Sequence, residues 1–219
     1  MDHLTARLNR LDTCAVSDAL DKLGLPGVVS GIDRLATTRR VAGRVVTVKL
    51  EKDDGRPVAS RHLGTTAIES CQPGDVIVIE QRSGIEAAAW GGNLSLGAQL
   101  RGVSGVIIDG PARDVDEARE YGFPLFARDH TSRTARSRIV ETGTNVPVTI
   151  GDVIVTPGDY VVGDGSAVVF VRATDIERVI EAAEAIAAKE RAMVAALREG
   201  QPISQVMGRS YETMLKSDP

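Results

Sequence analysis

Arg113 and Asp114 are the residues of this chain whose types and position most directly suggest chemistry. They end the stretch DGPARD (109–114), which continues the apolar segment GVIID. In open α/β sheets, ligands usually bind where the strands end at their carboxyl edge. A guanidinium group suits a carboxylate or a phosphate, and an aspartate offers a hard oxygen ligand for Mg²⁺. The pair could hold both side by side; alternatively, Asp114 caps the next helix and Arg113 is solvated.

A second candidate is the stretch WGGNLS (90–95), which contains the only tryptophan of the chain. Gly91 and Gly92 would let a ligand approach the backbone closely. If a helix starts here, its first free N–H groups lie at residues 93–95 and can bind an anion. The alternative is a glycine turn in which Asn93 caps the helix. Both candidates fall at the ends of neighbouring predicted strands, so each supports the other.

Other reactive residue types show no comparable pattern. His3, His62 and His130 lack the spacing of metal ligands. Cys14 and Cys71 form neither a CxxC nor a zinc pattern, and we expect two reduced thiols. No GxSxG, P-loop or Rossmann glycine pattern occurs, so the sequence supports neither a serine hydrolase nor the common nucleotide-binding folds.

The region around the two candidates alternates between strand and helix patterns. The sequence predicts a strand at 84–90, a helix at 94–103, a strand at 105–110, a helix at 114–122 and a strand at 123–128. This order favours parallel strands joined by right-handed crossovers. The ends of such strands would bring the two candidate stretches to one edge of the sheet.

The flanking regions have different patterns. Residues 4–23 show helical spacing, with a break that would make Thr13 an N-cap. The valine-rich stretch 40–51 predicts a strand. Region 139–172 contains short apolar runs separated by turns, which favours antiparallel hairpins. The sheet is therefore predicted to be mixed.

The longest predicted helix covers residues 174–200. Thr174 and Glu177 form a capping-box pattern at its start, and Gly200 ends it. At 1.5 Å per residue this helix would be roughly 38 Å long, so we expect it to extend across a neighbouring subunit. Glu190 lies within it, and its own sequence context favours a solvated side chain.

Composition limits the possible functions. The chain has 219 residues, of which 42% are hydrophobic, and a formal net charge of -4 without a basic cluster. This suits one α/β domain with a mixed β core (1–172) and a C-terminal helical arm (173–219). No uncharged apolar run approaches the ~18 residues of a membrane span, and the polar N-terminus lacks a secretion signal. We expect a cytoplasmic protein that binds neither nucleic acid nor membrane.

The segment from WGGNLS to FPLFAR (90–128) resembles the core signature of the RraA-like family. Its members include regulators of ribonuclease E activity and class II pyruvate aldolases acting on 4-hydroxy-4-methyl-2-oxoglutarate and 4-carboxy-4-hydroxy-2-oxoadipate. The similarity extends over most of the chain. It implies a compact α/β/α fold related to phosphohistidine swivelling domains. It also implies a homotrimer, or a hexamer of two trimers, with sites between subunits.

The resemblance also implies roles for single residues. In the family's aldolases, a divalent metal, usually Mg²⁺ or Mn²⁺, is bound by the aspartate that matches Asp114, and the arginine that matches Arg113 contacts the pyruvyl group. Backbone amides that match Asn93 and Leu94 hold the pyruvate carboxylate. A glutamate from the neighbouring subunit's C-terminal helix joins the water shell of the metal, and Glu190 is its best match. The predicted substrate-binding residues are Gly92, Asn93, Leu94, Ser95 and Arg113.

One position departs from the aldolase pattern. Aldolases carry an acidic residue, twenty further residues and then Arg-Asp, but counting back from Arg113 reaches Gly92. Loss of the acid should weaken metal binding or remove a route for proton transfer. Neither Asn93 nor Ser95 carries a charge that could replace it. The regulators often lack the intact Arg-Asp pair, which this chain keeps.

The leading hypothesis is a divalent-metal-dependent lyase that acts on a short 2-oxo acid. It would cleave a 4-hydroxy-2-oxo acid to release pyruvate, decarboxylate oxaloacetate, or both, because both reactions pass through the pyruvate enolate. Arg113 and the metal would stabilise that enolate. One alternative is a non-catalytic regulator that binds a ribonuclease E-like partner. Another is a related metal-assisted activity on a different substrate, because Gly92 opens space where an acid would lie.

Overall fold

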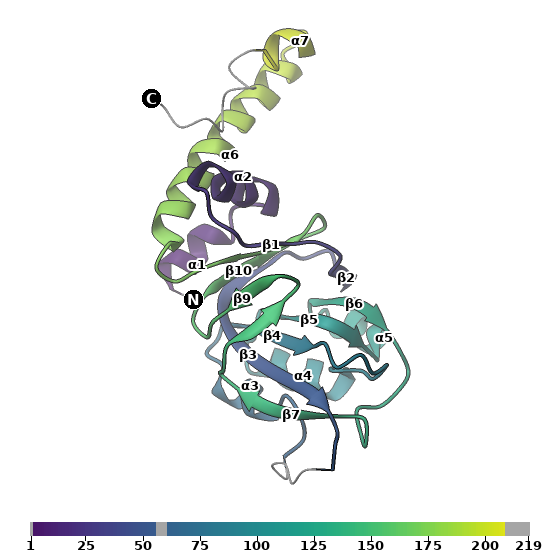
Figure 1. Ribbon diagram of the computed structural model, residues 1–219. Helices are drawn as coiled ribbons and strands as arrows, with labels where there is room; N and C mark the ends of the chain where they lie inside the picture. The colour runs from purple at the N-terminus through teal and green to yellow at the C-terminus, as the bar shows by residue number, and fades with distance from the viewer. Residues whose placement is uncertain (1, 56–60, 209–219) are drawn as a thin grey trace.

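The structure, a computed structural model, describes residues 2–55 and 61–208 (Figure 1). Its strands are β1 (Val28–Val29), β2 (Asp33–Ala36), β3 (Val41–Lys52), β4 (Val76–Gln81), β5 (Gly105–Ala112), β6 (Leu125–His130), β7 (Ile139–Thr144), β8 (Val148–Ile150), β9 (Val153–Val155), β10 (Tyr160–Gly163) and β11 (Val168–Val171). Its helices are α1 (His3–Leu8), α2 (Thr13–Leu23), α3 (Thr65–Ser70), α4 (Gly92–Leu100), α5 (Val115–Glu120), α6 (Ile176–Arg198) and α7 (Ile203–Val206). The predicted mixed α/β class is confirmed.

The main sheet has the strand order β1-β11-β10-β3-β4-β5-β6-β2, with β7 paired to β3. Strands β3, β4, β5 and β6 run parallel, and the alternation of strand and helix had predicted this for β5 and β6. Strand β10 pairs antiparallel with both β3 and β11, and β8 and β9 form a separate hairpin. The expected hairpins of the C-terminal region are therefore present.

Strand β3 shows how the sheet separates two apolar clusters. Its even-numbered residues Val46, Val48 and Leu50 join the cluster that includes buried side chains of α3, α4 and α5. Its odd-numbered residues Val41 and Val45 join a second cluster, which the β8–β9 hairpin helps to close. This alternation follows from the period of two in a strand. Both faces of the parallel strands are thus covered, and helices α4 and α5 lie on one of these two faces.

The segment 84–90 is not a strand, so that prediction was wrong. Two of its carbonyl groups are satisfied without a neighbouring strand, because the side-chain amide of Gln81 donates to the Ile85 and Ala87 oxygens at 3.0 and 2.9 Å. The Ala89 N–H donates to the Pro111 oxygen at 2.9 Å. The segment is therefore an extended connector held along the end of β5.

Two predicted helix caps were also wrong. Helix α2 is capped by Asp12 rather than Thr13, since an Asp12 carboxylate oxygen accepts the Ala15 N–H at 2.8 Å. Helix α6 has Asp175 at its N-cap position and no side-chain cap bond, so Thr174 and the glutamate three residues later form no capping box. In both cases the helix begins one or two residues away from the predicted position.

Helix α6 extends away from the sheet (Figure 1). Its first half is part of the chain's own core, where Ile176, Val179 and Ile180 pack in the same cluster as α1 and α2. Its second half carries the exposed side chains Val194 and Leu197. The boundary at residues 172 and 173 therefore divides a packed unit, and packing of the arm on a neighbouring subunit stays a prediction. Within the described residues, no helix combines the length and apolar character needed to cross a membrane.

Candidate functional site

The two candidate stretches meet in one cavity of about 270 Å³. Gly91, Gly92, Asn93 and Leu94 line it from the start of α4, and Arg113 and Asp114 line it from the turn between β5 and α5. The turn follows the carboxyl end of a parallel strand, where ligands bind in α/β sheets. The sequence-based prediction that these residues lie together is therefore matched by their positions.

The start of α4 offers two free N–H donors. The helix begins at Gly92, with Gly91 in an extended conformation as its N-cap, so Asn93 is not the cap. The Gly92 N–H donates to Oδ2 of Asp114 at 3.0 Å. In the part of the chain that the structure describes, the N–H groups of Asn93 and Leu94 have no hydrogen-bond acceptor. A helix start in this state suits an anion.

Asp114 has an unusual backbone conformation that directs its side chain to α4. Its φ and ψ are 56° and 41°, in the left-handed region that non-glycine residues rarely adopt. Although Asp114 occupies the N-cap position of α5, its side chain makes no cap bond there. It accepts instead from Gly92 and from Nε of Arg113, which lies 3.2 Å from each carboxylate oxygen. The alternative in which Asp114 is only a helix cap is therefore wrong.

Arg113 keeps most of its donors free. Its backbone N–H donates to the Trp90 oxygen at 3.0 Å, which ties the turn to the connector before α4. Its side chain is 39% exposed, and only Nε is bonded among the described residues. The two terminal nitrogens can still bind a carboxylate or a keto oxygen.

Ser95 lies behind the cavity and does not line it. Ser95 is only 1% exposed. Its hydroxyl group donates to the Gly91 oxygen at 3.2 Å and accepts from Nε1 of Trp90 at 3.0 Å. The Trp90 ring in turn stacks on Phe123, with 6.4 Å between ring centroids. Its position thus does not support the expected contact between Ser95 and substrate, and Ser95 instead holds the helix start in place.

The structure adds a carboxylate that the sequence analysis missed. A Cβ atom built on Gly92 would lie 1.5 Å from Oε2 of Glu117, so this carboxylate fills the space that a side chain at position 92 would need. Glu117 is in the first turn of α5, and its carboxylate has no hydrogen-bond or ion-pair partner within residues 2–55 and 61–208. The sequence signal that could have identified Glu117 is its position three residues after Asp114, which places it in the helical turn beside the Arg-Asp pair.

Asp114 and Glu117 suit a hard divalent cation. Mg²⁺ is commonly bound through one or two carboxylates while it keeps several waters. No group of three or more His, Cys, Asp and Glu side chains that could hold a metal is found among the described residues. The site of a single chain therefore fits a largely hydrated cation or one that receives a further ligand from another chain.

Glu190 lies elsewhere in the same chain. It lines a separate cavity together with Arg10 and Asp12, where α6 faces the turn between α1 and α2. Burial, followed by the charges of Asp12 and Asp18, raises the pKa of Glu190. The structure does not bring this residue to Arg113 within one chain, so a metal role for Glu190 would need a second subunit and stays a prediction.

Comparisons with known proteins identify relatives of this chain. A protein of Halalkalibacterium halodurans named "Putative 4-hydroxy-4-methyl-2-oxoglutarate aldolase" is 32% identical over 201 residues, which cover 91% of this chain and 90% of that protein. In two other curated relatives, the aligned parts span only 33% and 58% of the relatives' own lengths.

Solved structures show the same fold. An uncharacterized protein from Pseudomonas syringae pv. tomato has a TM-score of 0.84 at 29% identity, over 94% of this chain and 96% of that one. Streptomyces coelicolor RraAS2, described as an unusual member of the RNase ES inhibitor RraA protein family, has a TM-score of 0.77 at 26% identity, over 87% and 96%. The family model RraA-like, described as Aldolase/RraA, matches residues 13–170, and the chain therefore belongs to the RraA-like family.

Proposed function

We propose that this protein is a divalent-metal-dependent lyase that acts on a short 2-oxo acid. It cleaves a 4-hydroxy-2-oxo acid to release pyruvate, decarboxylates oxaloacetate, or does both. The observation that carries the proposal is the convergence, at one cavity, of two free backbone donors, the free end of Arg113 and the carboxylate of Asp114. The named aldolase relative at 32% identity supports the same reaction class.

The free donors bind different groups of the substrate. The N–H groups of Asn93 and Leu94 bind the carboxylate of the 2-oxo acid, helped by the positive end of the α4 dipole. The terminal nitrogens of Arg113 then face the keto oxygen. Negative charge develops on that oxygen when the C–C bond breaks, and a fixed guanidinium group stabilises it.

Asp114 and Glu117 would hold Mg²⁺ or Mn²⁺ beside the substrate. A divalent cation bound there supplies Lewis-acid stabilisation of the oxygen on which charge develops. Asp114 can serve as a metal ligand through Oδ1, because Oδ1 accepts only from Nε of Arg113 and keeps a second lone pair, whereas Oδ2 accepts from both Gly92 and Arg113. The Glu117 carboxylate replaces the acidic side chain that aldolases carry at the position of Gly92. It is the candidate acceptor for the proton of the substrate's hydroxyl group.

The proposal includes a cytoplasmic homotrimer or hexamer. In this assembly the neighbour's C-terminal helix would bring Glu190 to the cavity. The exposed apolar side chains Val194 and Leu197 on the second half of α6 support burial against another copy.

Release of pyruvate tests the proposal directly. Oxaloacetate and several 4-hydroxy-2-oxo acids are supplied with Mg²⁺, with Mn²⁺ or with EDTA, and pyruvate is measured by a coupled assay. We expect metal-dependent turnover that falls at least 100-fold in Asp114→Asn, the scale of losing one charge-stabilising group. Asp116→Asn is the matched control, because its side chain is 95% exposed and pairs with Arg119 on the outer face of α5. Turnover that EDTA and Asp114→Asn both leave unchanged would refute the proposal.

A second candidate function is a regulator without catalysis. The glycine at position 92 and the likeness to RraAS2 favour it. This function predicts no pyruvate release from any substrate and a stable complex with a ribonuclease E-like enzyme. Co-sedimentation with such an enzyme, together with its RNA cleavage rate, separates the two functions.

A further inference from the structure

A second cavity lies directly beside the candidate active site. It has a volume of about 480 Å³, against about 270 Å³ for the site cavity. Four residues line both cavities: His62, Leu63, Ala135 and Arg136. A ligand whose 2-oxo acid end lies at Arg113 can therefore continue past this shared wall, and the larger cavity has room for several further atoms.

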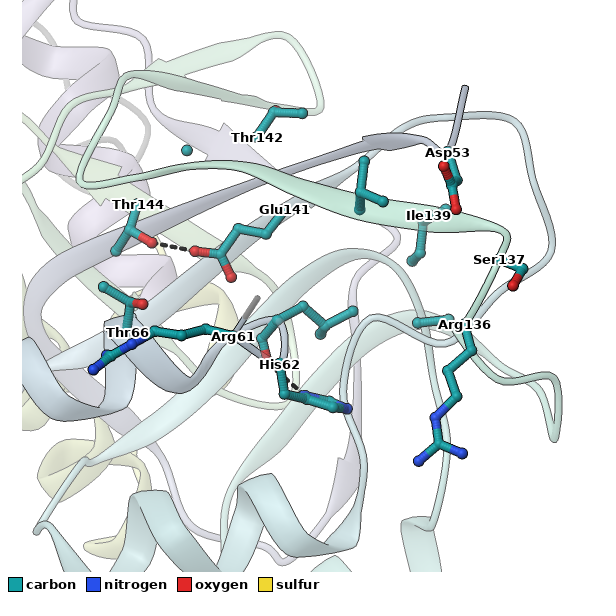
Figure 2. Close-up of a pocket in the computed structure, with 14 residues that line it drawn as sticks. Asp53, Arg61, His62, Thr66, Arg136, Ser137, Ile139, Glu141, Thr142 and Thr144 are labelled. Atoms are coloured by element: carbon teal, nitrogen blue, oxygen red, sulfur yellow. Dashed lines mark hydrogen bonds between the residues drawn. The ribbon is translucent and has the colours of Figure 1, made fainter. Parts of the chain in front are cut away.

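The charged groups on the far side of the second cavity already have partners. Arg61 pairs with Glu69 at 2.6 Å. One carboxylate oxygen of Glu141 accepts the Gly64 N–H at 2.6 Å, and the other accepts the Thr144 hydroxyl, a bond drawn in Figure 2. Glu141 thereby holds β7 against the start of α3, and the charge of Arg61 is balanced by that of Glu69.

Arg136 differs from these side chains in its contacts. Among the described residues it makes no hydrogen bond or ion pair, and only its backbone N–H is engaged, by the Thr134 hydroxyl oxygen at 3.4 Å. Figure 2 shows its side chain projecting away from Glu141 and Thr144, on the side of the His62 ring. The ring contributes one further nitrogen, because within the described parts of the chain only Nδ1 is bonded, to the Leu63 oxygen. The shared wall thus carries five unused guanidinium donors and an imidazole nitrogen.

We propose that Arg136 determines substrate specificity by binding an anionic group at the far end of the substrate. Preferred substrates then carry a second carboxylate, or a phosphate ester, beyond the carbon that bears the hydroxyl group. A planar guanidinium group binds either anion through two parallel hydrogen bonds. This inference rests on the proposed lyase function, which supplies the position of the 2-oxo acid end.

Kinetics with matched substrates test the role of Arg136. Three 4-hydroxy-2-oxo acids of equal chain length end in a carboxylate, a phosphate or a methyl group. We expect Arg136→Ala to lower the ratio of kcat/KM between the anionic and the methyl-ended substrates by about 10- to 100-fold, as one exposed charge-assisted contact would. Arg136→Lys should recover part of this kcat/KM ratio. The anionic group whose substrate loses more kcat/KM in Arg136→Ala identifies the group at the far end of the natural substrate.

Arg133→Ala is the matched control for this experiment. Arg133 belongs to the same loop, pairs with Glu86 at 3.2 Å and lines neither cavity. Its loss should leave the substrate ratio unchanged. An equal loss in Arg136→Ala on all three substrates would mean a structural role and would overturn the inference, as would no loss on the anionic pair.

A binding measurement separates this inference from the reaction itself. Oxalate, which has no far end, and 2-oxoglutarate, which has a far carboxylate, are titrated by calorimetry into the Mg²⁺-loaded protein. We expect Arg136→Ala to weaken 2-oxoglutarate by about 10-fold or more relative to oxalate. This result without pyruvate release in any assay would reject the lyase and keep the far-end site. Equal affinities of wild type and variant for 2-oxoglutarate would reject the far-end site whatever the turnover.

Discussion

Replacing Gly92 with alanine adds one methyl group at the start of α4, and the structure shows where it goes. The new Cβ would lie 1.5 Å from Oε2 and 2.6 Å from Cδ of Glu117, but 3.2 Å from its Cβ. The first two distances are impossible, whereas the third needs a shift of only a few tenths of an ångström. The Glu117 carboxylate must therefore rotate away while the backbone of α5 stays nearly in place.

The free energy of unfolding should change little. Glu117 is exposed and loses no hydrogen bond or ion pair among the described residues, so a poorer rotamer costs about 0.5–1.5 kcal/mol. Alanine in place of glycine in a helix recovers roughly 0.5–1 kcal/mol. We expect a net change within about 1 kcal/mol. Activity should fall far more, by on the order of 100-fold in kcat/KM, because the acid–base carboxylate of Glu117 has moved from its place beside Gly92.

Two measurements and one control variant decide this prediction. Thermal unfolding gives the stability, and pyruvate release gives kcat/KM. Gly97→Ala is the control, because its Cβ would meet nothing within 4 Å and it lies inside the same helix. It should stabilise the protein by roughly 0.5–1 kcal/mol and keep full activity. Wild-type turnover in Gly92→Ala would show that Glu117 plays no part in the reaction.

Moving the acid provides a stricter form of the same test. Glu117→Ala should lose activity to a similar extent as Gly92→Ala, and it also removes the side chain that blocks position 92. Adding Gly92→Asp to Glu117→Ala then restores a carboxylate to the same space. We expect the double variant to recover at least 10-fold in kcat/KM over Glu117→Ala. A double variant no better than Glu117→Ala would mean that the charge in that space does not matter.

Three further predictions concern groups outside the cavity. Burial raises the pKa of Cys71 to about 12, so a thiol reagent at pH 8 should label the exposed Cys14 and spare Cys71 until the chain unfolds; rapid labelling of both thiols in the folded protein would contradict this. The hydrogen bond from Arg7 lowers the pKa of the Glu184 carboxyl below its ordinary value of 4.5. The stabilisation it provides is present above pH 4.5 and is lost as the pH falls through the lowered pKa, so the small Tm difference between wild type and Glu184→Gln should vanish at strongly acidic pH. Ser95→Ala leaves a buried indole N–H without its acceptor, which should cost about 1–3 kcal/mol of stability in urea unfolding; a variant as stable as wild type would contradict that role.

Much of the arrangement around the cavity could be predicted from the sequence. Arg113 and Asp114 follow a buried apolar strand. In a parallel sheet, the turn after such a strand must lie at the carboxyl edge of the sheet, where ligands bind. Gly91 and Gly92 likewise marked a helix start, although the helix begins at Gly92 rather than at residue 94. These features depend on residues that are close in sequence, so local patterns were enough.

The remaining features depend on contacts between separate elements. The apolar run 84–90 suggested a strand, but the Gln81 side chain satisfies two of its carbonyl groups, and no periodic pattern reports that. The left-handed conformation of Asp114, which turns its carboxylate to α4, is equally invisible in composition. Glu117 looked like an ordinary exposed residue of a short helix, because its significance comes from the packing of α5 against the start of α4.

The contact between Gly92 and Glu117 constrains how this site can change during evolution. The two positions share one volume, so a long side chain at one excludes a carboxylate in place at the other. A lineage that moves the acid from position 117 to position 92 by single substitutions must pass through a chain with no acid or through one with two side chains in conflict. Position 92 can therefore take up an acid without conflict only after position 117 has changed.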